Sequence, residues 1–312
     1  MALAAILSAF RQLVLDGIEL PPTQDERVAL YSKKFQGLSP EEIEDLSKMD
    51  PARLKVYTSS VFMAEGGILS TAFPLTLAIL RRSWPGSMGP FSPAEVAQRV
   101  HQVSPWRGIH SQSLGLSLRD FIEQQLVPLC KSAPELLEVV GFEQAALEIR
   151  KALNESVAPQ STEIFNQISN MKVQELLNCV AYVPTLLRCC LLHYDIQALR
   201  QHFLKTGELS AIALRRHALI GARPFDYGVL WSEVPESVAS LMMEHRGEIS
   251  DRLTLEELAE GYLQGASHQS EEEAFNSFLL FVQELVKIGA LTIMLPESEL
   301  VAGPDRVMPD QR

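Results

Sequence analysis

One helix near the C-terminal end constrains the fold more than any other segment. Residues 270–291 have the sequence SEEEAFNSFLLFVQELVKIGAL, with Ser270 as the expected N-cap, Glu273 closing a capping box and Gly289 ending the helix. Apolar residues follow two lines at helical spacing. The first line is Phe275, Phe278, Val282 and Leu285, and the second is Ala274, Phe281 and Ile288. A helix that is apolar around most of its circumference must be covered on more than one side.

Two kinds of cover for the second line are compatible with the sequence. The helical N-terminal part of the chain, or a second copy of the protein, would bury it. Alternatively, the line forms one side of a groove opposite a strand expected at 225–231. An extended peptide there would add a strand through main-chain hydrogen bonds and insert its side chains into the groove. The candidate peptide-binding residues are Tyr227, Val229, Trp231, Ala274, Phe281 and Ile288.

The order of elements around this helix predicts a C-terminal α+β domain. Short strands are expected between residues 182 and 231, because no helical stripe runs through this part and Gly221 and Pro224 interrupt it. Three helices follow, at 235–245, 255–263 and 271–288, and then a closing strand in ALTIML. Strands followed by three helices and a strand are typical of a winged-helix or peptide-recognition-element-like unit. We expect this domain at 173–296 and a polar tail at 297–312.

The first 172 residues indicate a helical domain. Helix starts with Ser or Asp before Pro occur in SPEE (39–42), DPAR (50–53), SPAE (92–95) and SAPE (132–135). The opening MALAAILSAFRQLVLDG has no basic leader and a helical apolar period, so it indicates an amphipathic helix rather than a signal peptide. EGG at 65–67 indicates a helix break or a tight helix crossing. The expected fold class is mainly α with a small β component.

The charge of the chain argues against nucleic acid as a partner. Its 312 residues carry a formal net charge of −12, and residues 211–295 hold six Lys/Arg against thirteen Asp/Glu, a net −7. Such a surface would repel phosphate, whereas binding DNA requires the release of counterions from it. No uncharged apolar run approaches the roughly 18 residues of a membrane span, so we expect no membrane partner and a cytoplasmic protein.

No pattern of catalytic or metal-binding residues stands out. The four cysteines form no C-x-x-C pair, and the seven histidines are scattered without an H-x-H or H-E-x-x-H spacing. A Walker loop, G-x-G-x-x-G and G-x-S-x-G are also missing from the sequence. We therefore expect a binding protein with no catalytic residues and with no cofactor or metal held by this chain.

Three segments resemble a known family in their order along the chain. They are LKVYTSSVFMAEGGILSTAFPLTLAIL (54–80), APELLEVVGFEQAALEI (133–149) and YVPTLLRCCLLHYDIQAL (182–199). The residues that carry the likeness are Arg53, Val56 and Tyr57, then Phe73, Pro74, Leu75 and Thr76, then Pro134, Leu136, Phe142 and Glu143, then Pro184, Tyr194 and Asp195. These motifs resemble the partner proteins that accompany multinuclear non-heme iron-dependent oxidases in ribosomal peptide biosynthesis.

The resemblance implies a function and two partners. Such a protein binds a ribosomally made precursor peptide and presents its cysteine to the barrel-shaped oxidase, a separate chain that holds the iron. The segment before residue 50 is most similar to the partner from 3-thiaglutamate-type pathways, in which the oxidase excises the β-carbon of a C-terminal cysteine. The alternative function is that of an acidic winged-helix regulator, acting through protein contacts or on DNA.

Overall fold

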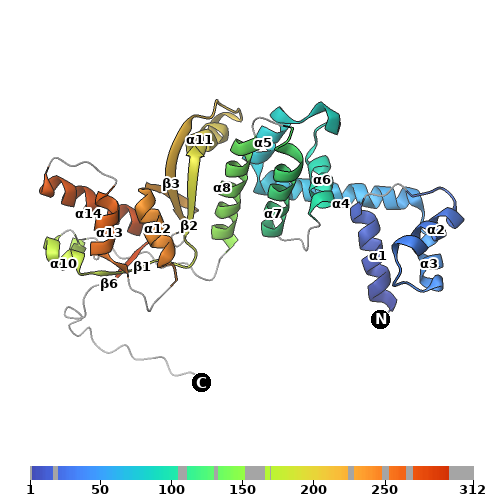
Figure 1. The fold of residues 1–312 in the computed structure, drawn as a ribbon, viewed down its shortest axis with the longest axis horizontal. Helices are drawn as coiled ribbons and strands as arrows, with labels where there is room; N and C mark the ends of the chain where they lie inside the picture. The colour runs from blue at the N-terminus through green and yellow to red at the C-terminus, as the bar shows by residue number, and fades with distance from the viewer. Residues whose placement is uncertain are drawn as a thin grey trace, which may run out of the picture. The chain divides into compact units, whose positions relative to one another are not determined.

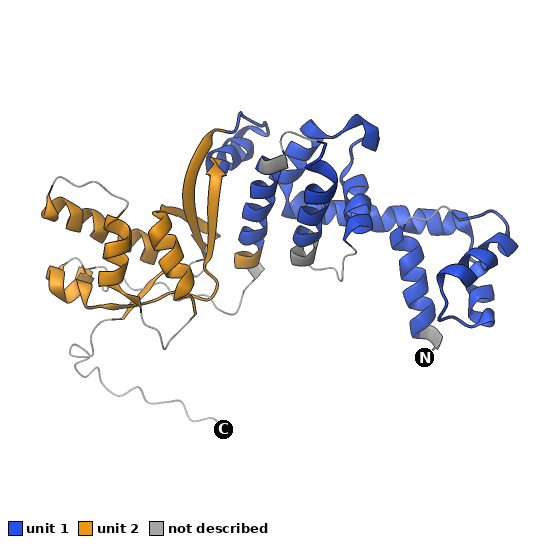
Figure 2. Cartoon of the chain, in the orientation of Figure 1, with its two compact units in different colours: residues 1–147, 196–212 blue, residues 148–195, 213–312 orange. Residues whose placement is uncertain are grey.

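The structure is a computed structural model, drawn in Figure 1. It describes residues 2–16, 20–104, 111–129, 133–151, 166–168, 170–223, 228–247, 253–264 and 270–294. The chain divides into two compact units (Figure 2). Unit 1 comprises Met1–Leu147 and Ile196–Ile212, and unit 2 comprises Glu148–Asp195 and Ala213–Arg312. The chain is mainly helical with a small β component, as the sequence predicts.

Unit 1 is built from helices. In chain order these are α1 (Ala2–Asp16), α2 (Gln24–Lys34), α3 (Pro40–Ser47), α4 (Pro51–Ala72), α5 (Pro74–Ser83), the 3-10 turn η1 (Gly86–Met88), α6 (Pro93–Val103), α7 (Ser111–Phe121), the π-helical turn η2 (Ile122–Leu126), α8 (Ala133–Lys151, whose last four residues fall in unit 2) and α11 (Ile196–Thr206). The first three helices and the start of α4 share an apolar core around Leu13, Tyr31 and Leu54.

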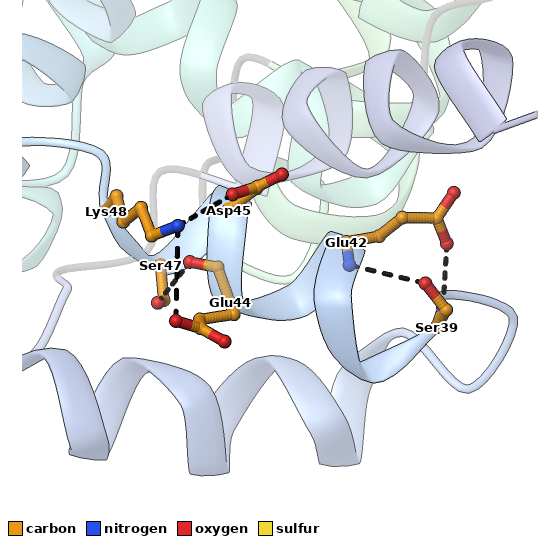
Figure 3. A network of polar contacts seen from close by, with 6 residues as sticks. All are labelled: Ser39, Glu42, Glu44, Asp45, Ser47 and Lys48. Carbon is orange, nitrogen blue, oxygen red and sulfur yellow. Dashed lines mark hydrogen bonds and ion pairs between the residues drawn. The ribbon is translucent and has the colours of Figure 1, made fainter.

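Side-chain caps fix the starts of α3, α4 and α6 where the sequence predicts them, and the Ser132 predicted to precede α8 lies outside the described residues. At α3, the Ser39 hydroxyl accepts from the Glu42 N–H at 3.3 Å, and the Glu42 carboxylate accepts from the Ser39 N–H at 2.7 Å (Figure 3). Lys48, at the other end of α3, bonds Asp45 at 2.8 Å. Each cap satisfies backbone donors that have no partner inside the helix. Helix α2 has the same capping box, from a Thr-x-x-Glu pattern for which no helix was expected.

The EGG segment is a tight helix crossing and not a helix break. Helix α4 runs through it without interruption, and Gly66 is buried where α4 crosses the start of α6. A Cβ at Gly66 would lie 2.7 Å from the Ala94 nitrogen and 2.7 Å from the Pro93 carbonyl carbon. Glycine therefore lets the two helices approach more closely than any side chain would.

A buried carboxylate from α8 caps the N-terminus of α5. Glu143 is 6% exposed and accepts from the Leu75 N–H at 2.9 Å, the Thr76 N–H at 3.0 Å and the Thr76 hydroxyl at 2.7 Å. Burial raises the pKa of Glu143 to about 7, against the three donors, which lower it. This contact joins two segments that lie far apart in the sequence.

The described part of unit 2 has two three-stranded antiparallel sheets, with helices beside them. Its elements are α10 (Val173–Leu177), β1 (Val180–Tyr182), β2 (Arg188–Tyr194), β3 (Leu214–Ala222), β4 (Leu230–Val234), α12 (Glu236–Glu244), β5 (Leu253–Thr254), α13 (Leu255–Leu263), α14 (Glu271–Lys287) and β6 (Thr292–Met294). One sheet has the order β2-β3-β4 and the other β5-β1-β6. The three helices expected after the strands are present as α12, α13 and α14, each within two residues of its expected bounds.

Helix α14 packs in the core of unit 2 through the first of its two apolar lines. Phe278, Val282 and Leu285 are at most 2% exposed, and Phe275 packs beside them. They contact a core built from both sheets and from α12 and α13. Gly289, at φ 76°, follows the end of the helix in the left-handed conformation that glycine adopts most readily.

The units divide the chain differently from the expected boundary at 172/173. The first boundary falls after Leu147, and α11 with the segment up to Ile212 belongs to unit 1. The packing of α11 explains why it belongs to unit 1. Leu199 of α11 is 2% exposed, and it lines a cavity of about 400 Å³ together with Ile79 of α5 and Glu135 of α8. The contacts of α11 are therefore made with helices much earlier in the chain.

In the described part of the chain, no single helix has the length and apolar character needed to cross a membrane. Helices α4 and α5 meet that test only as a pair, and they are bent by 109° at their junction.

Candidate functional site

A cleft of about 760 Å³ opens in unit 2 where β4 ends and α12 begins. Residues of β3, β4, α12 and α14 and of the C-terminal end of α13 line it. Its lining residues are Arg216, His217, Ala218, Glu233, Val234, Pro235, Glu236, Ser237, Tyr262, Gln264 and Phe281. The cleft therefore combines strand residues, charged side chains and two aromatic rings.

Two stacked rings form the aromatic wall of the cleft, which we define as Tyr262 and Phe281. Their centroids are 4.7 Å apart and their planes differ by 26°. Behind them, Phe278 lies 5.8 Å from Tyr262 and is 2% exposed, so the wall rests on the core of unit 2. Both wall residues are half-buried, which leaves part of each ring available to a ligand side chain.

Two bidentate ion pairs contribute residues to the cleft, Arg216 with Glu236 and Glu233 with Arg215. Arg216 donates to both oxygens of Glu236 at 2.7 and 2.8 Å, and Arg215 donates to both oxygens of Glu233 at 2.9 and 2.8 Å. The hydrogen bond from Arg216 lowers the pKa of Glu236, which keeps this carboxylate ionised. Because all four side chains are exposed to solvent, the pairs contribute little to stability and can exchange partners with a ligand.

The sheet next to the cleft has an open edge. Strand β4 lies at the end of the order β2-β3-β4, and no described strand pairs with its outer side. The last residue of β4, Val234, pairs with Ala218 of β3, and Pro235 follows it. Strand β2 pairs with β3 four residues further toward the start of β3, at Leu214. Unpaired main-chain groups on a sheet edge are a template for an added strand.

The structure brings one of the six predicted site residues to the cleft, Phe281. Trp231 lies on β4 but does not line the cleft. Its ring covers Gly221, where a Cβ would come within 2.5 Å of it. Val229 lies just before β4 and is half-buried, and Tyr227 falls outside the described residues.

The other two predicted residues on α14 do not line the cleft. Ile288 is 3% exposed and belongs to the core of unit 2. It is the C-cap residue of α14 and lies in the same core cluster as Ala290 and Leu291. Ala274 is half-buried near the start of α14.

Tyr262, Arg216 and Glu236 line the cleft, although no sequence pattern pointed to them. Tyr262 lies near the end of α13, and it belongs to none of the apolar lines that the sequence analysis describes. The two charged residues are far apart in the chain and meet only because β3 pairs with β4 and β4 leads into α12. Sequence alone offers no rule for finding such a pair.

The described thiols are poor nucleophiles. Burial raises the pKa of the Cys179 and Cys189 thiols. It also raises the pKa of the Cys190 thiol, to about 12. Thiols with such pKa values stay protonated near neutral pH, and the thiolate is the reactive form. Among the described residues, no group of three or more His, Cys, Asp or Glu side chains is arranged to hold a metal ion.

No protein-family model matches the chain, and no curated protein shows significant sequence similarity to it.

Proposed function

We propose that this protein is a non-catalytic subunit that binds an extended peptide in the cleft of unit 2. The observation that carries the proposal is the open edge of β4 beside the aromatic wall of Tyr262 and Phe281. A peptide strand gains main-chain hydrogen bonds from such an edge, and the adjacent aromatic surface receives one of its side chains.

The resemblance of the sequence narrows the proposal to one kind of complex. In it, the bound peptide is a ribosomally made precursor, and a separate multinuclear non-heme iron-dependent oxidase modifies its cysteine, by β-carbon excision if the pathway is of the 3-thiaglutamate type. The iron belongs to the oxidase. We place this complex in the cytoplasm, where precursor peptides are made.

We further propose that unit 2 is a variant of the winged-helix arrangement. The order α12, β5, α13, α14 and β6 supports this, since it places two helices between short strands of one sheet. Strand β1 lies between β5 and β6 and comes from an earlier part of the chain. Helix α14 would be the third helix of such a unit, but its first turn carries Glu271, Glu272 and Glu273, which disfavours a DNA-binding role.

Purification from the organism that encodes the chain tests this function. We expect the tagged protein to elute with a cysteine-containing polypeptide and an iron protein, identified by mass spectrometry and iron analysis. Phe281→Asp should lose the polypeptide, because a carboxylate in the aromatic wall repels an apolar side chain. Leu280→Asp is the matched control, since Leu280 is the preceding residue of α14 and is 67% exposed.

If Phe281→Asp melts earlier than the native protein, Phe281→Ala replaces it, since it removes the ring without adding charge. Capture of duplex DNA that weakens with salt, without any associated polypeptide, would contradict the proposal and favour the regulator. Equal retention of the polypeptide by the variants at 281 and the Leu280→Asp control would exclude this cleft as its site.

A further inference from the structure

The cavity of about 400 Å³ within unit 1 combines an apolar interior with charged side chains at its rim. The last turns of α5, the first turns of α8 and α11 and residues 209–212 line it (Figure 1). Ile79 and Leu199 are at most 6% exposed and form its interior, beside the half-buried Leu209 and Ile212. Small-molecule sites in proteins have volumes of about 300–1,000 Å³. The cavity therefore has the size of a site for a small molecule.

Two opposite charges line this cavity, and the described residues leave both unpaired. Arg82 belongs to the last turn of α5 and is exposed, whereas Glu135 belongs to the first turn of α8 and is half-buried. No described residue forms an ion pair or hydrogen bond with either side chain, and the two do not bond each other. Each charge by itself is ordinary at its helix end, because it complements the helix dipole. Their place on one cavity without mutual contact leaves both available to a ligand.

The main chain of residues 209–212 adds hydrogen-bonding groups to the wall of the cavity. This segment leads from α11 to β3 and belongs to no helix or strand. No described residue forms a hydrogen bond with its N–H or C=O groups, although Leu209, Ser210 and Ile212 are half-buried. Main-chain groups sheltered from bulk water are usually paired with protein or ordered water. A small polar ligand in the cavity would therefore find both donors and acceptors along this segment.

We propose that this cavity binds a zwitterionic amino acid with an aliphatic side chain, either free or in a dipeptide. The carboxylate of the ligand accepts hydrogen bonds from the Arg82 guanidinium, whose planar fork matches a carboxylate. Its ammonium group donates to the Glu135 carboxylate, and its side chain packs on Ile79 and Leu199. A ligand with both charges pairs Arg82 and Glu135 together, whereas a simple anion or cation would pair only one of them. This site is independent of the proposed peptide cleft.

Calorimetric titration of the full-length protein with L-leucine and with leucyl-leucine tests this site and distinguishes the two forms of the ligand. We expect saturable binding of at least one of them at millimolar concentration or below. Isocaproate lacks the ammonium group of leucine and isopentylamine lacks its carboxylate, so each should bind on the order of tenfold more weakly. Glycine keeps both charges but has no aliphatic side chain to bury, and it should also bind more weakly.

Arg82→Gln and Glu135→Gln should each weaken binding on the order of tenfold, because each removes one charge-assisted contact. Arg81→Gln is the matched control, since Arg81 is exposed in the same turn of α5 and does not line the cavity. Ala211→Phe, at an exposed position of the wall, should block the cavity while the melting temperature stays unchanged. Equal losses in Arg81→Gln and Arg82→Gln would show that only net charge matters and would overturn the proposal. Absence of binding, or equally tight binding of isocaproate or isopentylamine, would overturn it as well.

Discussion

At the scale of single residues, the contact between Glu143 and the start of α5 shows how a buried charge is held. The carboxylate is almost fully buried, yet three donors converge on it, two of them N–H groups that α5 leaves without helical partners. The helix N-terminus also favours negative charge. Together these interactions offset part of the cost of removing the carboxylate from water.

Glu143→Gln should lower the free energy of unfolding by about 1–3 kcal/mol. The NH2 group of the glutamine would face N–H and hydroxyl donors that now donate to the carboxylate, so at least one of these hydrogen bonds would be lost. Thr76→Val removes only the hydroxyl donor and should cost less, about 1 kcal/mol. Chemical denaturation of the two variants measures both losses. A Glu143→Gln protein as stable as the native one would show that the cap contributes nothing.

At the scale of elements, the crossing of α4 over α6 depends on one glycine of an adjacent pair. Gly66 faces the backbone of Pro93 and Ala94, whereas a Cβ at Gly67 would have no neighbour within 4 Å. Both glycines lie inside α4, where alanine is intrinsically the better helix former by about 1 kcal/mol. Replacing glycine with alanine would therefore cause a backbone clash at residue 66 and none at residue 67.

Gly67→Ala should raise the free energy of unfolding by about 0.5–1 kcal/mol, because it gains helix propensity without a clash. Gly66→Ala should lower it by about 1–3 kcal/mol, because the backbone of α6 cannot move aside as a side chain would. Thermal and chemical denaturation of the two variants, measured side by side, give the signs. Stabilisation by both would mean that α6 is not in close contact with α4.

At the scale of the whole molecule, two carboxyls of unit 1 link folding to pH. Burial raises the pKa of Glu65 to about 7, although Arg11 lowers it, and the pKa of Glu143 reaches a similar value. A carboxyl whose pKa is higher in the folded protein contributes stability that is fully present below its unfolded pKa. That stability is lost as the pH rises through the folded value. His101, whose pKa burial lowers, acts in the opposite direction and loses stability as the pH falls.

Glu65→Gln isolates one of these contributions. Oε2 of Glu65 is buried without a hydrogen-bond partner among the described residues, so a neutral amide of the same shape loses little. We expect the variant to match the native protein at about pH 4 and to exceed its unfolding free energy by about 1–2 kcal/mol at about pH 8. This is less than the full linkage, because solvent reaches part of the carboxyl. Equal stability at the higher pH would show that Glu65 ionises in the folded protein without cost.

Prediction from the sequence succeeded where the signal is local. Capping residues fixed the starts of α3, α4 and α6, and the glycine after α14 fixed its end. Helices α12 to α14 follow the strands in the expected order. Helix α11 was not expected, although Ile196, Leu199 and Phe203 have helical spacing and Gly207 follows the helix in the left-handed conformation.

The candidate site illustrates the limit of local patterns. Periodicity identified Phe281, but it grouped Phe281 with Ile288, which is buried in the core of unit 2. It also placed Trp231 in the groove, although that ring covers Gly221 and does not line the cleft. Burial depends on which element packs on which face, and a periodic pattern does not carry that information.

The sequence by itself determined the helices, their caps and the acidic surface, because these depend on residues within a few positions of each other and on composition. Only the tertiary structure decided that Glu143 caps α5, that α11 belongs with the N-terminal helices and that Tyr262 lies against Phe281. These contacts join residues far apart in the chain. Their formation depends on the loop closures and packing of the whole unit, which no local window of sequence encodes.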